Sequence, residues 1–137
     1  MQYNQGARLD PSQVEYRSGG LNAPGSVTAL AVTGNTLYLG GSFTHVSGGG
    51  AGFAYLKRGA RLDATTGAPD TAWNPAFDGT PIFVSLSASG DRAYYGGFMS
   101  TMNDDVTAAM RFVAVTTTAP AQPVAVCPTN STVVAGW

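Results

Sequence analysis

The residues of this chain that could do chemistry are few and scattered. His45 is the only histidine, so it cannot contribute to a site built from several histidines. It could act as a general base with Ser42, Ser47 or an aspartate brought close by folding, yet a surface or hydrogen-bonding role is the more common one for a lone histidine. We therefore predict no catalytic residue and no cofactor site, and a non-enzyme more readily than an enzyme.

One loop gathers oxygen atoms that could bind a metal ion. Asn103, Asp104 and Asp105 are consecutive, and carboxylate and amide oxygens are the donors that a hard cation such as calcium accepts. The complete calcium-loop pattern is missing, and the same residue types form turns and cap helices. The sequence favours a turn here and leaves calcium as a secondary hypothesis.

Aromatic side chains offer another kind of site. Tyr38, Tyr94 and Trp73 could line a surface on which carbohydrate rings stack. In repeated strands, however, aromatic residues are more often part of the core. We expect a carbohydrate-binding surface only if alternate members such as Tyr38 and Tyr94 are exposed on one face.

Composition excludes several classes of partner. Seven basic residues face eight acidic ones among 137, so the net charge of -1 gives no reason to bind nucleic acid. No apolar run is long enough for a membrane span, and no signal peptide is visible at the start. A hydrophobic fraction of 44% with 18 glycines and eight prolines is typical of short strands joined by tight turns.

The elements that must position these residues are organised as repeats. GNTLYLGGSF at 34–43 returns as GDRAYYGGF at 90–98, and subtracting 40 from 96 places the two Gly-Gly pairs 56 residues apart. Regular self-similarity at tens of residues indicates stacked supersecondary units. We predict an all-β fold of antiparallel β-repeat units that resemble propeller blades and form an incomplete array.

Each repeated phrase predicts a β-hairpin. Gly34-Asn35 and Gly90-Asp91 supply the positive φ that a two-residue turn requires. The glycine pairs that follow indicate a bulge or close packing of another backbone. The predicted strands cover 27–32 with 36–40 in the first hairpin and 82–87 with 92–96 in the second.

Aligning the hairpins at the 56-residue spacing predicts a shared core face, because strand side chains alternate sides. The predicted core positions are Leu30 with Leu86, Val32 with Ala88, and Tyr38 with Tyr94. The glycine-rich stretch 47–52 has almost no side chains to pack, so we expect a flexible, exposed loop there. A third strand is predicted at 53–62.

A second phrase, GARLD, stands at 6–10 and 59–63, and a degraded copy follows at 111–120. After the second copy, Asp63 can accept backbone N–H groups while Gly67 closes a turn in the left-handed conformation. We therefore divide the chain into the end of a preceding unit (1–26), a complete unit (27–79), a degenerate unit (80–120) and a proline-interrupted tail or linker (121–137) that contains the single Cys127.

The segments VTALAVTGNTLYLGGSFTHVSG and ARLDATTGAPDTAWNP resemble a family of bacterial β-propeller-type repeats, the delta-sixty repeats, usually found in secreted or surface chains. The resemblance extends over 6–115, although in the second unit Phe98-Met99 replaces the Ser-Phe order and the Asp-Thr-Gly turn is absent. It implies four-stranded antiparallel blades around an axis, and an extracellular or cell-surface location.

The turn 63–67 followed by Trp73 is also similar to the tryptophan-docking pattern of quinoprotein propellers. Because this tryptophan comes late for that pattern, we expect Trp73 to join one blade to the next rather than to mark a quinone site.

Together these observations favour a non-catalytic structural or recognition module of a secreted or cell-surface assembly. Two blades do not close a ring, so we expect partners in further copies of itself or in neighbouring β-repeat chains. The alternatives are a fragment of a propeller-type enzyme, such as a hydrolase, lyase or quinoprotein, and a filament or adhesive subunit.

Overall fold

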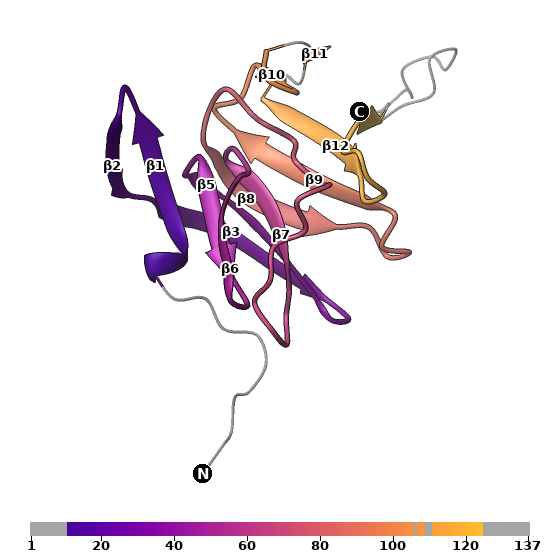
Figure 1. The fold of residues 1–137 in the computed structure, drawn as a ribbon. Coiled ribbons are helices and arrows are strands. Elements are labelled where there is room, and N and C mark those ends of the chain that lie inside the picture. The colour runs from indigo at the N-terminus through magenta and orange to yellow at the C-terminus, as the bar shows by residue number, and fades with distance from the viewer. Residues whose placement is uncertain (1–10, 106, 109–110, 125–137) are drawn as a thin grey trace, which may run out of the picture.

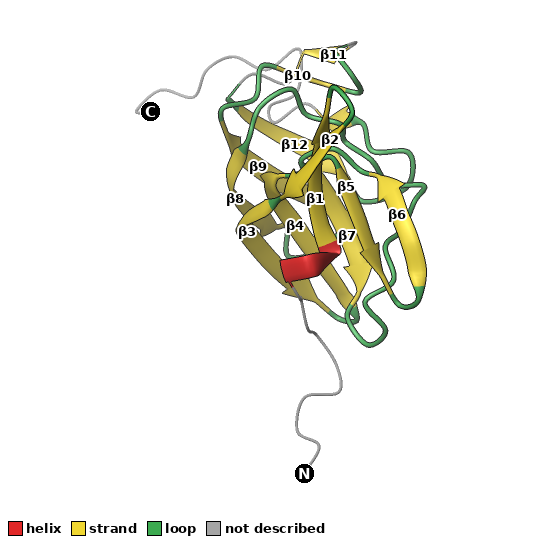
Figure 2. Cartoon of the chain, turned by 60° about the vertical axis from the view of Figure 1, so that its left-hand side comes forward, coloured by secondary structure: helices red, strands yellow, loops and turns green. Residues whose placement is uncertain are grey.

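The computed structural model describes residues 11–105, 107–108 and 111–124. The first GARLD phrase, Cys127 and most of the predicted tail lie outside these residues. The described chain contains no α-helix, only the short 3-10 helix η1 (Pro11–Gln13), and its strands pair antiparallel throughout (Figure 2). This confirms the all-β prediction.

Three larger sheets account for most of the strands. Sheet A has the order β2-β1-β5-β6, sheet B the order β3-β4-β7 and sheet C the order β13-β12-β9-β8, while β10 and β11 form a separate small hairpin. The bounds are β1 Val14–Ser18, β2 Leu21–Pro24, β3 Ser26–Thr33, β4 Thr36–Ser42, β5 His45–Gly48, β6 Ala51–Tyr55, β7 Gly59–Asp63, β8 Pro81–Leu86, β9 Arg92–Gly97, β10 Thr101–Met102, β11 Thr107–Ala108, β12 Phe112–Thr116 and β13 Pro123–Val124.

The three sheets lie in layers with sheet B in the middle (Figure 1). Strand β4 is therefore buried on both sides: Leu37 and Leu39 face sheet A, and Tyr38 faces sheet C. One core lies between sheets A and B and a second between sheets B and C. The first core contains Val14, Leu37, Leu39, Phe43, Val46, Leu56, Ala60 and Leu62; the second contains Tyr38, Trp73, Phe77, Tyr95, Met99, Met102, Val113 and Val115 among others.

Strand pairing shows two equivalent units within the described residues. In the first unit β4 pairs with β3 and β7, and in the second β9 pairs with β8 and β12. Between the second and third strands of each sheet the chain leaves as a hairpin, β5-β6 in the first unit and β10-β11 in the second. The side chains on the corresponding faces match, because Leu39, Phe43 and Val46 of the first core correspond to Tyr95, Met99 and Met102 of the second.

The Gly-Gly pairs lie opposite β-bulges in both units, as predicted. The ladder shifts register between Val27 and Ala29 opposite the first pair, and between Pro81 and Phe83 opposite the second. A Cβ on Gly41 would lie 2.1 Å from the Ser26 carbonyl oxygen, and one on Gly97 2.5 Å from that of Thr80. Close backbone approach therefore requires glycine at these positions.

The hairpin alignment predicted from the sequence is wrong by two residues on its first strand. Leu30 pairs with Leu39 as Val84 pairs with Tyr95, so Leu30 corresponds to Val84 and not to Leu86. The cause is the difference in turn length. Residues 34–35 form a two-residue turn in the first hairpin. In the second, the hydrogen bond from the Ser87 N–H to the Arg92 carbonyl closes a four-residue turn, 88–91.

The predicted core changes accordingly. Tyr38 is buried and Leu86 packs against the second core, but Leu30 is 54% exposed, Val32 is 56% exposed and Ala88 is also exposed. Tyr94 is half-buried on the side of sheet C that faces away from sheet B. The two units thus stack in the same direction, one behind the other, instead of burying identical faces against each other.

Two further local expectations need correction. The glycines of 47–52 belong to the β5-β6 hairpin and not to a long loop, and Gly48 and Gly49 pack against Gly67 and Ala68, although Gly49, Gly50 and Gly52 are exposed as expected. The predicted strand 53–62 is two strands, because the chain leaves sheet A after Tyr55 and enters sheet B at Gly59.

The turn after β7 follows the prediction. Asp63 Oδ1 accepts the N–H groups of Thr65 and Thr66 at 2.8 and 2.9 Å, and Gly67 has a φ of 80°. These backbone hydrogen bonds hold the pKa of Asp63 below its usual range.

Candidate functional site

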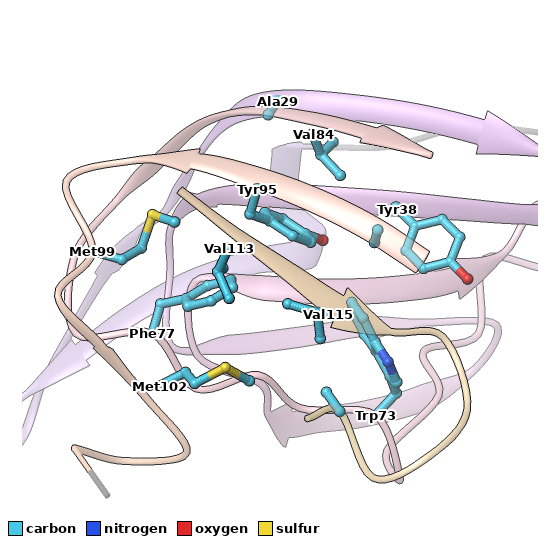
Figure 3. Packing of buried hydrophobic residues seen from close by; sticks show 12 residues of the cluster. Ala29, Tyr38, Trp73, Phe77, Val84, Tyr95, Met99, Met102, Val113 and Val115 are labelled. Atoms are coloured by element: carbon cyan, nitrogen blue, oxygen red, sulfur yellow. The ribbon is translucent and has the colours of Figure 1, made fainter. Parts of the chain in front are cut away.

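Side-chain hydrogen bonds join the first unit to the second. The Trp73 indole N–H donates to the Thr116 carbonyl oxygen at 2.8 Å, and the Tyr95 hydroxyl donates to the Leu39 carbonyl oxygen at the same distance. Figure 3 shows the two donor side chains among the buried residues of the second core. The Thr28 hydroxyl donates to the Pro81 carbonyl at 2.5 Å. Trp73 therefore connects the units as predicted, with its ring buried and its N–H satisfied.

Arg61 adds a further connection on the same side of sheet B. Its guanidinium donates to the Thr117 carbonyl, forms an ion pair with Asp70 at 2.8 Å and lies over the Trp73 ring. These contacts lie between sheet C and the side of sheet B that carries Tyr38. We call that side of sheet B the front face of the first unit. The front face of the second unit is the equivalent side of sheet C, which carries Tyr94.

The front face of the second unit has no sheet on it among the described residues. Phe83, Tyr94 and Phe112 lie there, with the Phe112 ring centroid 6.0 Å from each of the other two. Phe83 is 43% exposed and Phe112 46% exposed. The Phe83 ring lies against Gly96, and a Cβ on this glycine would be 2.1 Å from the ring. The equivalent glycine of the first unit, Gly40, is covered by Pro81 and Tyr95 of the second unit. The Phe83 ring thus covers its glycine from within the same unit.

This second front face has lost the polar groups that join the first one to its neighbour. In the first unit Arg61 pairs with Tyr38, and in the second unit Ala114 pairs with Tyr94. Ala114 therefore occupies the position of Arg61. Ile82 occupies the bulge position of Thr28 and is 54% exposed. Ile82, Phe83 and Phe112 therefore form an apolar patch on this surface, and a partner would bind it by burying aromatic rings.

A second unpartnered surface lies on the opposite side of sheet B. Leu30 and Val32 of β3 correspond to Val84 and Leu86 of β8, which pack into the core between sheets B and C. Sheet A covers β4 and β7 but leaves Leu30 and Val32 more than half exposed. We call this pair the rear patch. The chain thus exposes the front face of its second unit and, at the rear of its first, the β3 part of the surface that the second unit uses in the internal contact.

The three aromatic residues predicted as a carbohydrate surface do not form one together. Trp73 is fully buried and Tyr38 is 3% exposed, so neither ring is open to a sugar. Tyr94 alone lies on the front face of sheet C, stacked beside Phe112. Sequence reasoning missed Phe83 and Phe112, although their place in the predicted repeats could have indicated them.

The predicted calcium ligands form a tight turn between β10 and β11. Asn103, Asp104 and Asp105 all have positive φ, from 57° to 71°. Asp104 accepts a hydrogen bond from the Tyr55 hydroxyl and Asp105 accepts one from the Thr101 hydroxyl. In the described part of the chain no group of three or more metal-ligating His, Cys, Asp or Glu side chains comes together.

His45 makes a local hydrogen bond with its neighbour in the chain. Its Nδ1 lies 2.8 Å from the Thr44 hydroxyl oxygen, and its ring contacts that of Tyr55. Burial and the nearby Arg17 lower the pKa of His45, so the imidazole is neutral at neutral pH. His45 also lines a hollow that Asp78 and Asp105 share.

Comparison with known proteins adds no assignment. No family model, curated protein or solved structure matches this chain. In the part that the structure describes, no helix has the length and apolar character needed to cross a membrane. The resemblance to delta-sixty repeats accordingly remains a prediction.

Proposed function

We propose that this protein is a non-catalytic structural or recognition module of a secreted or cell-surface β-repeat assembly, related to β-propeller blades, that associates with further copies of itself. The copies stack head to tail: the rear patch of one lies on the front face of the second unit of the next. The resemblance to delta-sixty repeats supports the location and the relation to propellers.

One observation supports this function above the others. The internal contact between the units packs Val84 and Leu86 against the front face of sheet B, and their counterparts Leu30 and Val32 are exposed. An aromatic front face is exposed at the other end of the stack. Such a contact joins two different surfaces, so it either closes into a ring or continues as a filament.

A complementation experiment tests this arrangement. Leu30→Asp blocks the rear patch and Phe112→Asp blocks the front face, so each variant alone is expected to be monomeric in analytical ultracentrifugation while the wild type associates. Mixed together, the two variants each retain one intact surface and are expected to form a 1:1 dimer that cannot grow.

The matched control is Leu21→Asp, which places a charge on an exposed leucine of β2 outside both surfaces. It is expected to associate like the wild type. A Leu30→Asp variant that still dimerises alone would show that the front faces pair with each other, and a monomeric wild type at high concentration would overturn self-association.

The filament or adhesive alternative shares the same contact and differs only in closure. Negative-stain electron microscopy of the wild type distinguishes rings from open polymers. An enzyme fragment is the weaker alternative, because association explains the exposed apolar side chains at the two ends of the stack and a catalytic step does not.

A further inference from the structure

A polar hollow of about 420 Å³ lies away from both stacking surfaces, where sheet A approaches the loops of the second unit. Its size falls within the range of small-molecule sites. Strands β1 and β6, the link from β6 to β7 and the turn after β10 all contribute to it. The side chains relevant here are Tyr16, Tyr55, Lys57, Arg58, Asp78 and Asp105.

Arg58 is held in an unusual position at this hollow. Its φ is 62°, a left-handed conformation that residues with a Cβ rarely adopt. Two backbone hydrogen bonds fix it there, from the Arg58 N–H to the Phe43 carbonyl at 2.9 Å and from the Gly41 N–H to the Arg58 carbonyl at 3.2 Å. Strain of this kind gathers at functional sites, because the surrounding structure must impose it.

The guanidinium of Arg58 has donors to spare. Its Nε is buried without a hydrogen-bond partner among the described residues, and its Nη1 bonds only to the Phe77 carbonyl, at 3.3 Å. The group lies over the Tyr16 ring, 5.7 Å from the centroid. Because Nε has almost no exposed surface, an acceptor in the hollow would reach this guanidinium through its Nη1 and Nη2 groups, which have four N–H donors between them.

The acidic groups of the hollow do not neutralise its cations. Within the described residues, neither Lys57 nor Arg58 forms an ion pair. Asp78 accepts from the Ser100 N–H and hydroxyl and from the Thr101 N–H, and Asp105 accepts from the Thr101 hydroxyl. A carboxylate has about four acceptor positions, so both aspartates retain room for further donors.

We propose that this hollow binds a carboxylated sugar, with Arg58 and Lys57 holding its carboxylate. The two aspartates accept hydrogen bonds from its hydroxyl groups, and the rings of Tyr16 and Tyr55 flank it. A phosphate dianion fits less well, because the two carboxylates repel the second negative charge. This site does not depend on the self-association proposed above.

The test is an NMR titration of the full ¹⁵N-labelled chain with glucuronate, glucose and inorganic phosphate. Glucuronate is expected to shift the Arg58 Nε–H signal and to saturate. Glucose lacks the carboxylate and is expected to bind about ten-fold or more weakly, the equivalent of one charge-assisted hydrogen bond. Phosphate is expected to bind more weakly than glucuronate.

Arg58→Gly is the decisive variant, because glycine adopts the left-handed conformation without strain and the fold is retained while the guanidinium is lost. It is expected to lose glucuronate binding. Arg111→Gln removes an exposed cation outside the hollow and is expected to bind like the wild type. Equal binding of glucose, tighter binding of phosphate, or unchanged binding by Arg58→Gly would each overturn the proposal.

Discussion

At the scale of single residues, this fold is held by side chains that satisfy buried backbone carbonyls across the gap between sheets. Tyr95 is fully buried, and burial raises its pKa well above the usual value, so its hydroxyl stays protonated and donates to Leu39. Trp73 does the same for Thr116. Each bond fixes how far one unit is displaced along the next, which apolar packing alone would leave open.

A carboxylate at the edge of the polar hollow leads to a prediction about pH. Burial pushes the pKa of Asp78 up, but hydrogen bonds from Ser100 and Thr101 outweigh it and hold the pKa at about 2. Because the folded pKa lies below the ordinary value of 3.8, the charged form stabilises the fold above about pH 4 and this contribution is lost as pH falls through 2.

Asp78→Asn is therefore expected to lower the free energy of unfolding by about 1 kcal/mol at pH 7, after allowance for solvent screening. In urea unfolding measured from pH 7 down to pH 2, the difference in free energy of unfolding between this variant and the wild type should disappear. Ser100→Ala is the companion variant and should raise the pKa of Asp78. A carboxyl titration of the wild type near 3.8 would contradict this account.

At the scale of elements, the β-bulges decide where each hairpin bends. Gly41 lies directly opposite the bulge of β3, and its backbone approaches that of Ser26 so closely that a Cβ has no room. Gly52, in β6, has no atom within 4 Å of its Cβ position and no unusual φ. The two glycines are thus both in strands but differ in what surrounds them.

Gly41→Ala is expected to destabilise the protein by about 3 kcal/mol, since backbone must move to make room for the methyl group. Gly52→Ala is the control and is expected to change stability by less than about 0.5 kcal/mol. Thermal unfolding followed by circular dichroism measures both. If the two substitutions lowered stability equally, the close backbone approach at the bulge would not be the reason that Gly41 is a glycine.

Elements also show what the sequence could and could not predict. Turn chemistry and the repeated Gly-Gly pairs located both hairpins, their bulges and the Asp63 turn, because these signals are local. Leu30 and Val32 are exposed although they were predicted as core. The alignment assumed equal turns in the two hairpins, but the second hairpin has a longer turn that shifts one strand by two residues. Likewise, the hollow around Arg58 joins segments far apart in the chain, so no spacing indicated it.

At the scale of the whole molecule, strand β4 belongs to both cores at once. Leu39 contributes to the core between sheets A and B, and on the same strand Tyr38 contributes to the core between sheets B and C. Loss of packing on either side therefore removes support from the strand on which the other side depends. The stacked units should unfold as one cooperative body, although the chain is built from repeats.

This coupling can be tested with one truncation in each core. Leu39→Ala and Met102→Ala remove fully buried side chains from different cores and are each expected to cost about 2–5 kcal/mol. In both variants, amide exchange in sheets A and C should accelerate together, because either loss lowers the stability of the single folded state. If Met102→Ala leaves exchange in sheet A unchanged while sheet C opens, the units unfold independently, and head-to-tail partners would then stabilise one unit at a time.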